Sequence, residues 1–69
     1  MKDHIASEAQ RLLKECRRLL KDAEELAYEC RGAGWHGVHI PRQVRSQTEA
    51  AEDLLYAACQ ALEGVRRAL

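Results

Sequence analysis

The sequence GAGWHGVHIP, at residues 32–41, divides the chain into two long segments that both favour helix. Three of its first six residues are glycine, which ends a helix that enters from the amino-terminal side and makes Gly32 suitable for a left-handed C-cap. Pro41 suits the first turn of a following helix, because its fixed φ is already helical. We therefore expect a glycine-rich loop over residues 32–40.

The segments on both sides of this loop have the composition of helices. Residues 3–31 contain neither Gly nor Pro and are rich in Leu, Ala, Glu, Lys and Arg, the strongest helix formers. The second helix is expected over residues 41–68, although the capping-box pattern SQTE leaves open a start at Ser46. The sequence therefore predicts an all-α antiparallel helical hairpin that forms a single domain over residues 1–69.

Apolar residues recur at heptad spacing in both helices. With Cys16 at position a, the first helix carries a d row of Ile5, Leu12, Leu19 and Leu26, small residues Ala9, Cys16, Ala23 and Cys30 at a, and an acidic row of Glu8, Glu15, Asp22 and Glu29 at g. With Val44 at position a, the second helix is apolar over a wide arc that spans a, d and e, and its position g holds Gln43, Ala50, Ala57 and Gly64. A glycine inside a helix costs about 1 kcal/mol relative to Ala, so we expect another backbone to pass close to Gly64.

A hairpin alone has no second layer to cover apolar arcs this wide. Small single cores supply only about 3 to 5 kcal/mol without a staple or association. We therefore expect two copies of the chain to form a homodimer, in which two hairpins make a four-helix bundle.

The chain has 69 residues, 11 basic and 11 acidic side chains and a formal net charge of zero. This length excludes folds with a large enclosed cleft, and the neutral total lacks the positive charge typical of nucleic-acid-binding domains. No window approaches the roughly 18 apolar residues of a membrane-spanning helix, and the amino terminus has no secretory signal pattern. We therefore expect a cytoplasmic protein without a membrane partner.

Residues 32–37, GAGWHG, match the G-x-G-x-x-G pattern of dinucleotide-binding loops. In that motif a strand precedes the glycines, whereas here a long helix precedes them. The sequence also lacks a nucleophile elbow and an H-E-x-x-H pair. It therefore predicts neither an enzyme nor a bound organic cofactor.

Three cysteines are an odd number, which argues against a disulfide framework. Cys16 and Cys30 lie about 21 Å apart along one predicted helix and cannot form a bond with each other. A disulfide from Cys16 to Cys59 across the hairpin, or a symmetric bond between chains, remains open. We expect Cys16 and Cys59 to behave as buried small hydrophobic residues, with Cys59 the more accessible because it lies at the edge of the apolar arc.

Cys30, His36 and His39 gather soft and borderline metal ligands at the loop end of the hairpin. Zinc or another transition metal would accept this thiolate and the two imidazoles, with Glu29, water or the dimer mate as a fourth ligand. The spacing is not that of a standard zinc motif. The alternative, which we favour, is that Cys30 closes the a row while both histidines are exposed loop residues.

Two features suggest contacts with other molecules. Trp35, in the loop, either plugs the end of the bundle or anchors a partner. A basic row on the outer face of the first helix consists of Arg11, Lys14, Arg18 and Lys21. Such a row can follow phosphates, but interleaved acidic residues and the lack of neighbouring aromatic residues favour a solvated face.

These patterns favour a small self-associating helical module with an interaction or regulatory function that binds another protein, with Trp35 and the basic row as contact residues. One alternative is a metal-binding four-helix bundle that uses the Cys and His residues of the loop. A second alternative is a nucleic-acid-binding dimer that uses the basic row.

Overall fold

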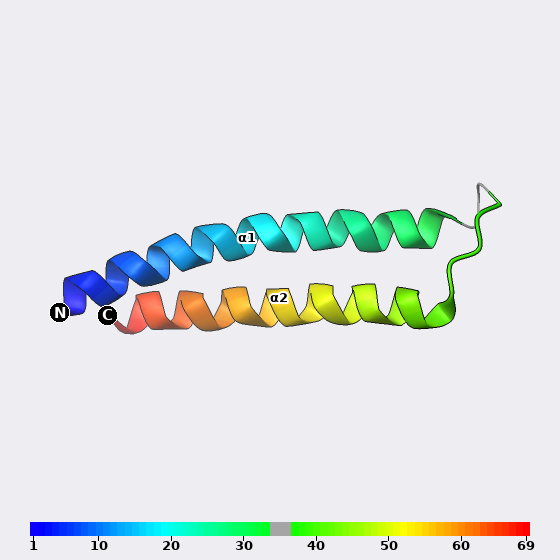
Figure 1. Ribbon diagram of the computed structural model, residues 1–69. Helices are drawn as coiled ribbons and strands as arrows, with labels where there is room; N and C mark the ends of the chain where they lie inside the picture. The colour runs from blue at the N-terminus through cyan, green and yellow to red at the C-terminus, as the bar shows by residue number, and fades with distance from the viewer. Residues whose placement is uncertain (34–36) are drawn as a thin grey trace.

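The computed structural model describes residues 1–33 and 37–69, and this part of the chain is helical apart from the connection and the two terminal residues. Helix α1 spans Lys2–Gly32 and helix α2 spans Arg42–Ala68. The helices lie side by side and antiparallel, with both termini at one end and the connection at the other (Figure 1). The structure thus confirms the all-α helical hairpin.

The end of α1 differs from the expected one. The helix continues through Gly32 to Ala33, whose φ of −59° and ψ of −34° are right-handed, so the left-handed cap at Gly32 was wrong. Among the described residues, Gly37 has the positive φ, at 74°. The N–H of Val38 donates to the carbonyl oxygen of Ala33 at 3.1 Å. The conformation that favours glycine therefore lies at Gly37 rather than at Gly32.

Helix α2 begins directly after Pro41. Pro41 has a φ of −55° and a ψ of 142°, and its carbonyl oxygen accepts the N–H groups of Val44 and Arg45 at 3.0 and 3.2 Å. The alternative start at Ser46 was wrong, because helical hydrogen bonding is already established by Arg45. The fixed φ of proline orders the chain for this entry, so a capping box is not required.

The apolar core between the helices is small. Leu13, Cys16 and Cys59 form its buried centre, and three partly buried leucines pack around them: Leu20, Leu55 and Leu62. Helix α1 turns its a and e positions toward α2, and its buried residues are Ala9, Leu13, Cys16, Ala27 and Cys30. Small residues at a let the helix backbones approach, while leucine at e fills the space between them.

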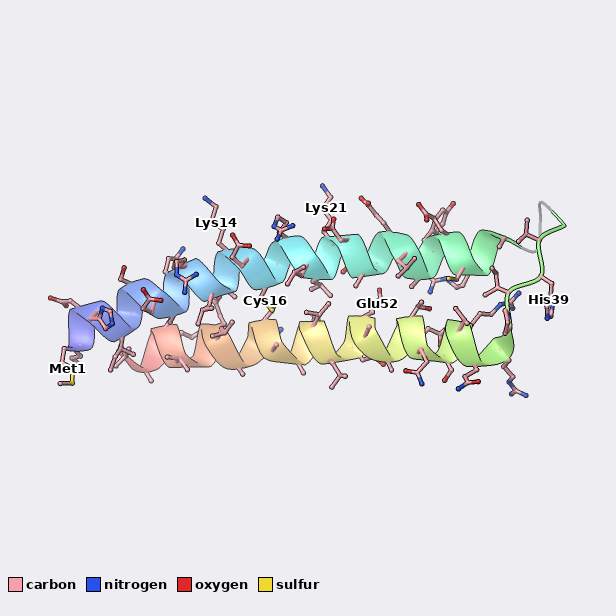
Figure 2. All side chains as sticks on the ribbon, viewed as in Figure 1. Met1, Lys14, Cys16, Lys21, His39 and Glu52 are labelled. Atoms are coloured by element: carbon pink, nitrogen blue, oxygen red, sulfur yellow. The ribbon has the colours of Figure 1, made fainter. Side chains whose placement is uncertain are left out.

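Toward the loop the contact between the helices becomes polar on the α2 side. Arg45, Thr48 and Glu52 of α2 are half-buried there, and Figure 2 shows Glu52 between the two helices. The Nε atom of Arg45 is buried and has no hydrogen-bond partner in the described part of the chain. Apolar burial therefore stabilises the terminal half of the hairpin more than the loop half.

Helix α2 is also rotated relative to the expected apolar arc. It presents positions b and e to α1, so that Cys59 at b is buried, while Val44 and Val65 at a and Leu54 at d are exposed. Polar contacts between the helices stabilise this orientation from the other side: Arg17 pairs with Glu63 at 2.9 Å and Arg66 donates to Gln10 at 2.7 Å.

The hairpin is long and thin, measuring 54 × 15 × 13 Å. Its radius of gyration is 15.8 Å, against about 11 Å for a compact domain of this length. Its accessible surface is 5513 Å², about 1,100 Å² more than the roughly 4,400 Å² of a compact monomer of this mass. Neither helix, over its described residues, is long and apolar enough to cross a membrane.

Candidate interaction face

The d row of α1 lies outside the hairpin core. Its four residues, Ile5, Leu12, Leu19 and Leu26, are each between 44% and 51% exposed. Because they recur every seven residues, they form one continuous stripe along nearly the whole of α1. Helix α1 therefore has two apolar stripes, of which α2 covers the one at a and e.

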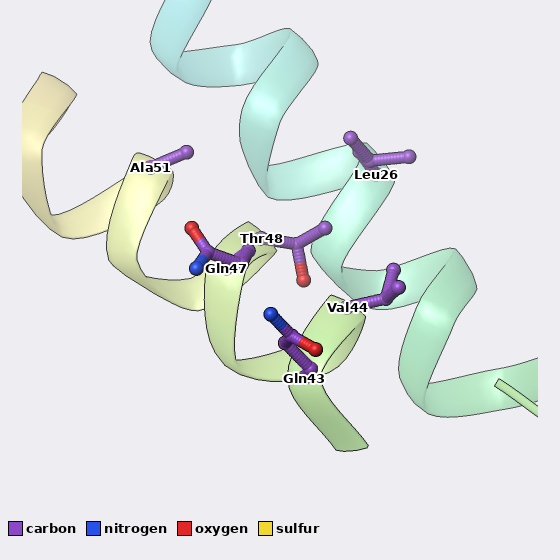
Figure 3. Close-up of a pocket in the computed structure, with 6 residues that line it drawn as sticks. All are labelled: Leu26, Gln43, Val44, Gln47, Thr48 and Ala51. Atoms are coloured by element: carbon purple, nitrogen blue, oxygen red, sulfur yellow. The ribbon is translucent and has the colours of Figure 1, made fainter. Parts of the chain in front are cut away.

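Helix α2 continues this apolar surface on the same side of the hairpin. A groove of about 490 Å³ near the loop is lined by Leu26 from α1 and by Gln43, Val44, Gln47, Thr48 and Ala51 from α2 (Figure 3). A second groove, of about 260 Å³, lies near the termini, where Ile5 and Leu12 of α1 face Val65 of α2. The apolar face, as we define it, consists of the d row and of Val44, Ala51, Ala58 and Val65.

The two borders of the apolar face differ in charge. On α1 the border is the acidic row, and nearby arginines partly neutralise it: Arg11 pairs with Glu8 at 2.8 Å, and Arg18 with Glu15 at 3.1 Å and with Asp22 at 3.7 Å. These pairs are exposed, so each contributes only a few tenths of a kcal/mol. On α2 the border is position g, where the residues are uncharged and mostly small: Gln43, Ala50, Ala57 and Gly64. A Cβ atom on Gly64 would meet no described atom within 4 Å, so the close neighbour expected there does not come from α1.

All four residues of the basic row are exposed on α1. Figure 2 shows Lys14 and Lys21 extending away from α2. Arg11 and Arg18 are paired with acidic side chains of the same helix, which reduces the field that this row projects into solvent. The arrangement favours a solvated outer face, and contacts of this row with a partner stay a prediction.

The proposed metal ligands fall into different surroundings. Cys30 is buried in α1, and His39 is exposed at the loop end (Figure 2). His36 and Trp35 lie outside the described residues. Within residues 1–33 and 37–69 the structure brings together no group of three His, Cys, Asp or Glu side chains. The metal site and the role of Trp35 therefore stay predictions.

Glu63 connects the helices on the side opposite the apolar face, which the sequence analysis did not anticipate. Its carboxylate accepts from Arg17 of α1 at 2.9 Å and from Arg66 of its own helix at 2.8 Å. The spacing of Glu63 and Arg66 indicates the pair within α2. The pair with Arg17 requires the register between the helices, for which the sequence carries no direct signal.

Cys16 and Cys59 meet between the helices. They are 8% and 9% exposed, which confirms the expectation that both behave as buried small residues, and Cys59 also lines a groove on the surface of the hairpin. The rotation of α2 explains the burial of Cys59, because it places position b of α2 in the contact with α1. Burial raises the pKa of the Cys59 thiol, the neighbouring Cys16 thiol raises it further, and the Arg17 guanidinium opposes both effects.

Comparison of the chain with protein-family models, with curated proteins and with solved structures gave no match. Over residues 1–33 and 37–69, the fold and its surfaces define the class of protein as a two-helix hairpin with an exposed apolar face.

Proposed function

We propose that this chain is a small self-associating interaction module, in which the apolar faces of two copies pack together to form a four-helix bundle. The exposed d row is the observation that carries the proposal. Continuous apolar surface of this length is uncommon on monomers and marks sites of association. Its four side chains share one heptad position, as expected of residues that contact another helix.

The size of the available surface supports a dimer. The hairpin exposes about 1,100 Å² more than a compact monomer of its mass, and a standard protein interface buries about 800 Å² on each partner. The core of the single chain is also short of apolar contacts near the loop, where α2 contributes Arg45, Thr48 and Glu52. Packing of the apolar faces would add a second core of Leu, Ile, Val and Ala residues along the whole hairpin.

The borders of the apolar face favour one arrangement of the two copies. If each α1 packs over the α1 of its partner, two acidic rows meet along the same edge and repel each other. If each α1 packs over the partner's α2, the acidic row meets the border of small residues around Ala50, Ala57 and Gly64. We infer the second arrangement, in which the loops of the two copies lie at the same end of the bundle.

Two surfaces remain outside such a bundle, and the proposal includes their binding to a second, different protein. The basic row lies on the outer face of α1, and Trp35 belongs to the loop. The proposal includes a cytoplasmic location, where disulfides are uncommon and, when present, are mostly transient or redox-sensing. It includes no catalytic activity and no cofactor.

Sedimentation equilibrium tests the association. We expect the wild-type chain to sediment with twice its mass of 7.8 kDa at micromolar concentrations. The double variant Leu12→Gln/Leu19→Gln, which places polar groups in the middle of the apolar face, is expected to sediment as a monomer. Tyr28→Gln is the control, because Tyr28 is a large exposed side chain of the same helix that lies outside the apolar face, in a groove with Lys21, Glu24 and Glu25.

Helix content measured by circular dichroism distinguishes loss of association from loss of the fold. A wild-type chain that remains monomeric at about 100 µM would overturn the proposal, since associations of that weakness amount to less than about 5.5 kcal/mol. Dissociation by Tyr28→Gln to the same extent as by the double variant would also overturn it, because the apolar face would then have no special role.

A further inference from the structure

The core of the hairpin holds two thiols on different helices. Cys16 and Cys59 belong to one buried cluster with Leu13. The Sγ atom of Cys16 lies 3.5 Å from the carbonyl oxygen of Leu55, to which it donates. Leu55 precedes Cys59 by one turn of α2, so Cys16 lies against the turn that carries Cys59. The two thiols therefore lie in the same layer of the core on facing helices, as a disulfide between α1 and α2 requires.

We propose that Cys16 and Cys59 are a redox-active dithiol, which forms a disulfide between α1 and α2 by exchange with a small disulfide such as oxidised glutathione. This proposal does not depend on self-association. It adds a modification site at the centre of the hairpin, on two residues that the proposed interaction surfaces do not use.

The groove on the polar side of the hairpin gives access to this pair. Its volume is about 380 Å³, and Cys59 lines it together with Arg17, Tyr56, Gln60 and Glu63. Cys59 is therefore the thiol that a small disulfide reaches first. The groove lies on the opposite side from the apolar face, so pairing of two hairpins through the apolar face leaves it open.

The reaction requires two exchange steps. The Cys59 thiolate attacks one sulfur of oxidised glutathione, and the glutathione S–S bond breaks to release one glutathione thiolate. The Cys16 thiolate then attacks the Cys59 sulfur of this mixed disulfide and releases the second glutathione. The two protons lost by the cysteines are taken up by the two departing thiolates. Overall, two cysteines are oxidised and one glutathione disulfide is reduced to two thiols.

The surroundings of Cys59 determine how this reaction depends on pH. The thiolate is the attacking species, and burial favours the neutral thiol, which keeps the pKa of Cys59 above its ordinary value. We therefore expect slow exchange at neutral pH and a rate that rises throughout the range from pH 7 to pH 9.

Cys30 provides an internal control. It is as buried as Cys16 and occupies the same heptad position, but it lies about 21 Å further along the same helix. Cys30→Ala therefore removes a thiol without removing the pair. Cys16→Ala leaves Cys59 with no second thiol to complete the exchange.

The experiment incubates the folded chain with excess oxidised glutathione at pH 8, blocks the remaining thiols with an alkylating reagent and measures the mass. For Cys30→Ala we expect a product about 2 Da lighter than its reduced chain, and for wild type the same loss together with one alkyl group on Cys30. In both, the peptides of Cys16 and Cys59 are expected to be joined after digestion. For Cys16→Ala we expect a single glutathione attached at Cys59. We also expect the bond to raise the thermal midpoint by about 10 °C or more, because it closes a loop of roughly 40 residues.

Three results would overturn the proposal. They are a mixed disulfide as the final product in wild type, a bond that forms only in denaturant, and a Cys59 bond that joins two chains. The Leu12→Gln/Leu19→Gln variant separates this proposal from self-association, because a monomeric hairpin that keeps its helix content is expected to form the same disulfide at the wild-type rate.

Discussion

Leu12 and Leu13 are adjacent in the sequence but lie in opposite environments. Leu13 is 1% exposed and packs against α2 beside Cys16, whereas Leu12 is 44% exposed on the apolar face. In a helix, neighbouring residues point about 100° apart, so one leucine serves the core of the hairpin and the other serves the surface that we propose for self-association. Two adjacent leucines therefore have separate roles in this protein.

Truncation of the two leucines is expected to separate these roles. Leu13→Ala removes a fully buried side chain and is expected to lower the free energy of unfolding by about 2 to 4 kcal/mol, much of the stability of so small a core. Leu12→Ala is expected to lower it by about 1 kcal/mol or less in the monomer, because half of that side chain is already in water. Urea unfolding followed by circular dichroism measures both, in the Leu19→Gln background and at a concentration at which sedimentation shows that background to be monomeric. Equal losses for the two variants would contradict the structure around α1.

At the scale of the helices, the sequence was sufficient to predict the hairpin but not the rotation of α2. The absence of Gly and Pro over residues 3–31 and the glycines of the connection predicted two long helices, which the structure confirms. Helix α2, however, is apolar over a, d and e, and an arc that wide allows more than one orientation toward α1. The pairing of Arg17 with Glu63 and the burial of Cys59 select positions b and e. Such contacts depend on the register between the helices, which heptad spacing within one helix does not specify.

A substitution at Gly64 tests this rotation, because in the hairpin Gly64 lies on the side of α2 that points away from α1. Gly64→Ala is expected to stabilise the chain by up to about 1 kcal/mol, since a Cβ there meets open space and alanine has the higher helix propensity. Gly32→Ala is the matched control, because a Cβ at Gly32, the last residue of α1, also meets open space. Thermal unfolding measures both variants. A loss of stability for Gly64→Ala alone would mean that another backbone lies against this residue.

At the scale of the whole molecule, the ratio of surface to buried core sets the stability. An elongated hairpin of 69 residues exposes 5513 Å², and the buried cluster between its described helices is small, so folding of a single copy is marginal. Association through the apolar face would bury Ile5, Leu12, Leu19 and Leu26 without any change in the hairpin. Folding and association are therefore expected to be coupled, so that the stability of the chain depends on its concentration.

The thermal midpoint provides the test of this coupling. For two chains of this length that unfold and dissociate together, the midpoint is expected to rise by about 5 °C for each tenfold increase in concentration. Scans at about 5, 50 and 500 µM would therefore span roughly 10 °C for the wild-type chain. The Leu12→Gln/Leu19→Gln variant is expected to show a midpoint that is lower and independent of concentration. A wild-type midpoint that stays constant over this range would show that one copy folds without its partner, and that the apolar face contributes nothing to the stability of the hairpin.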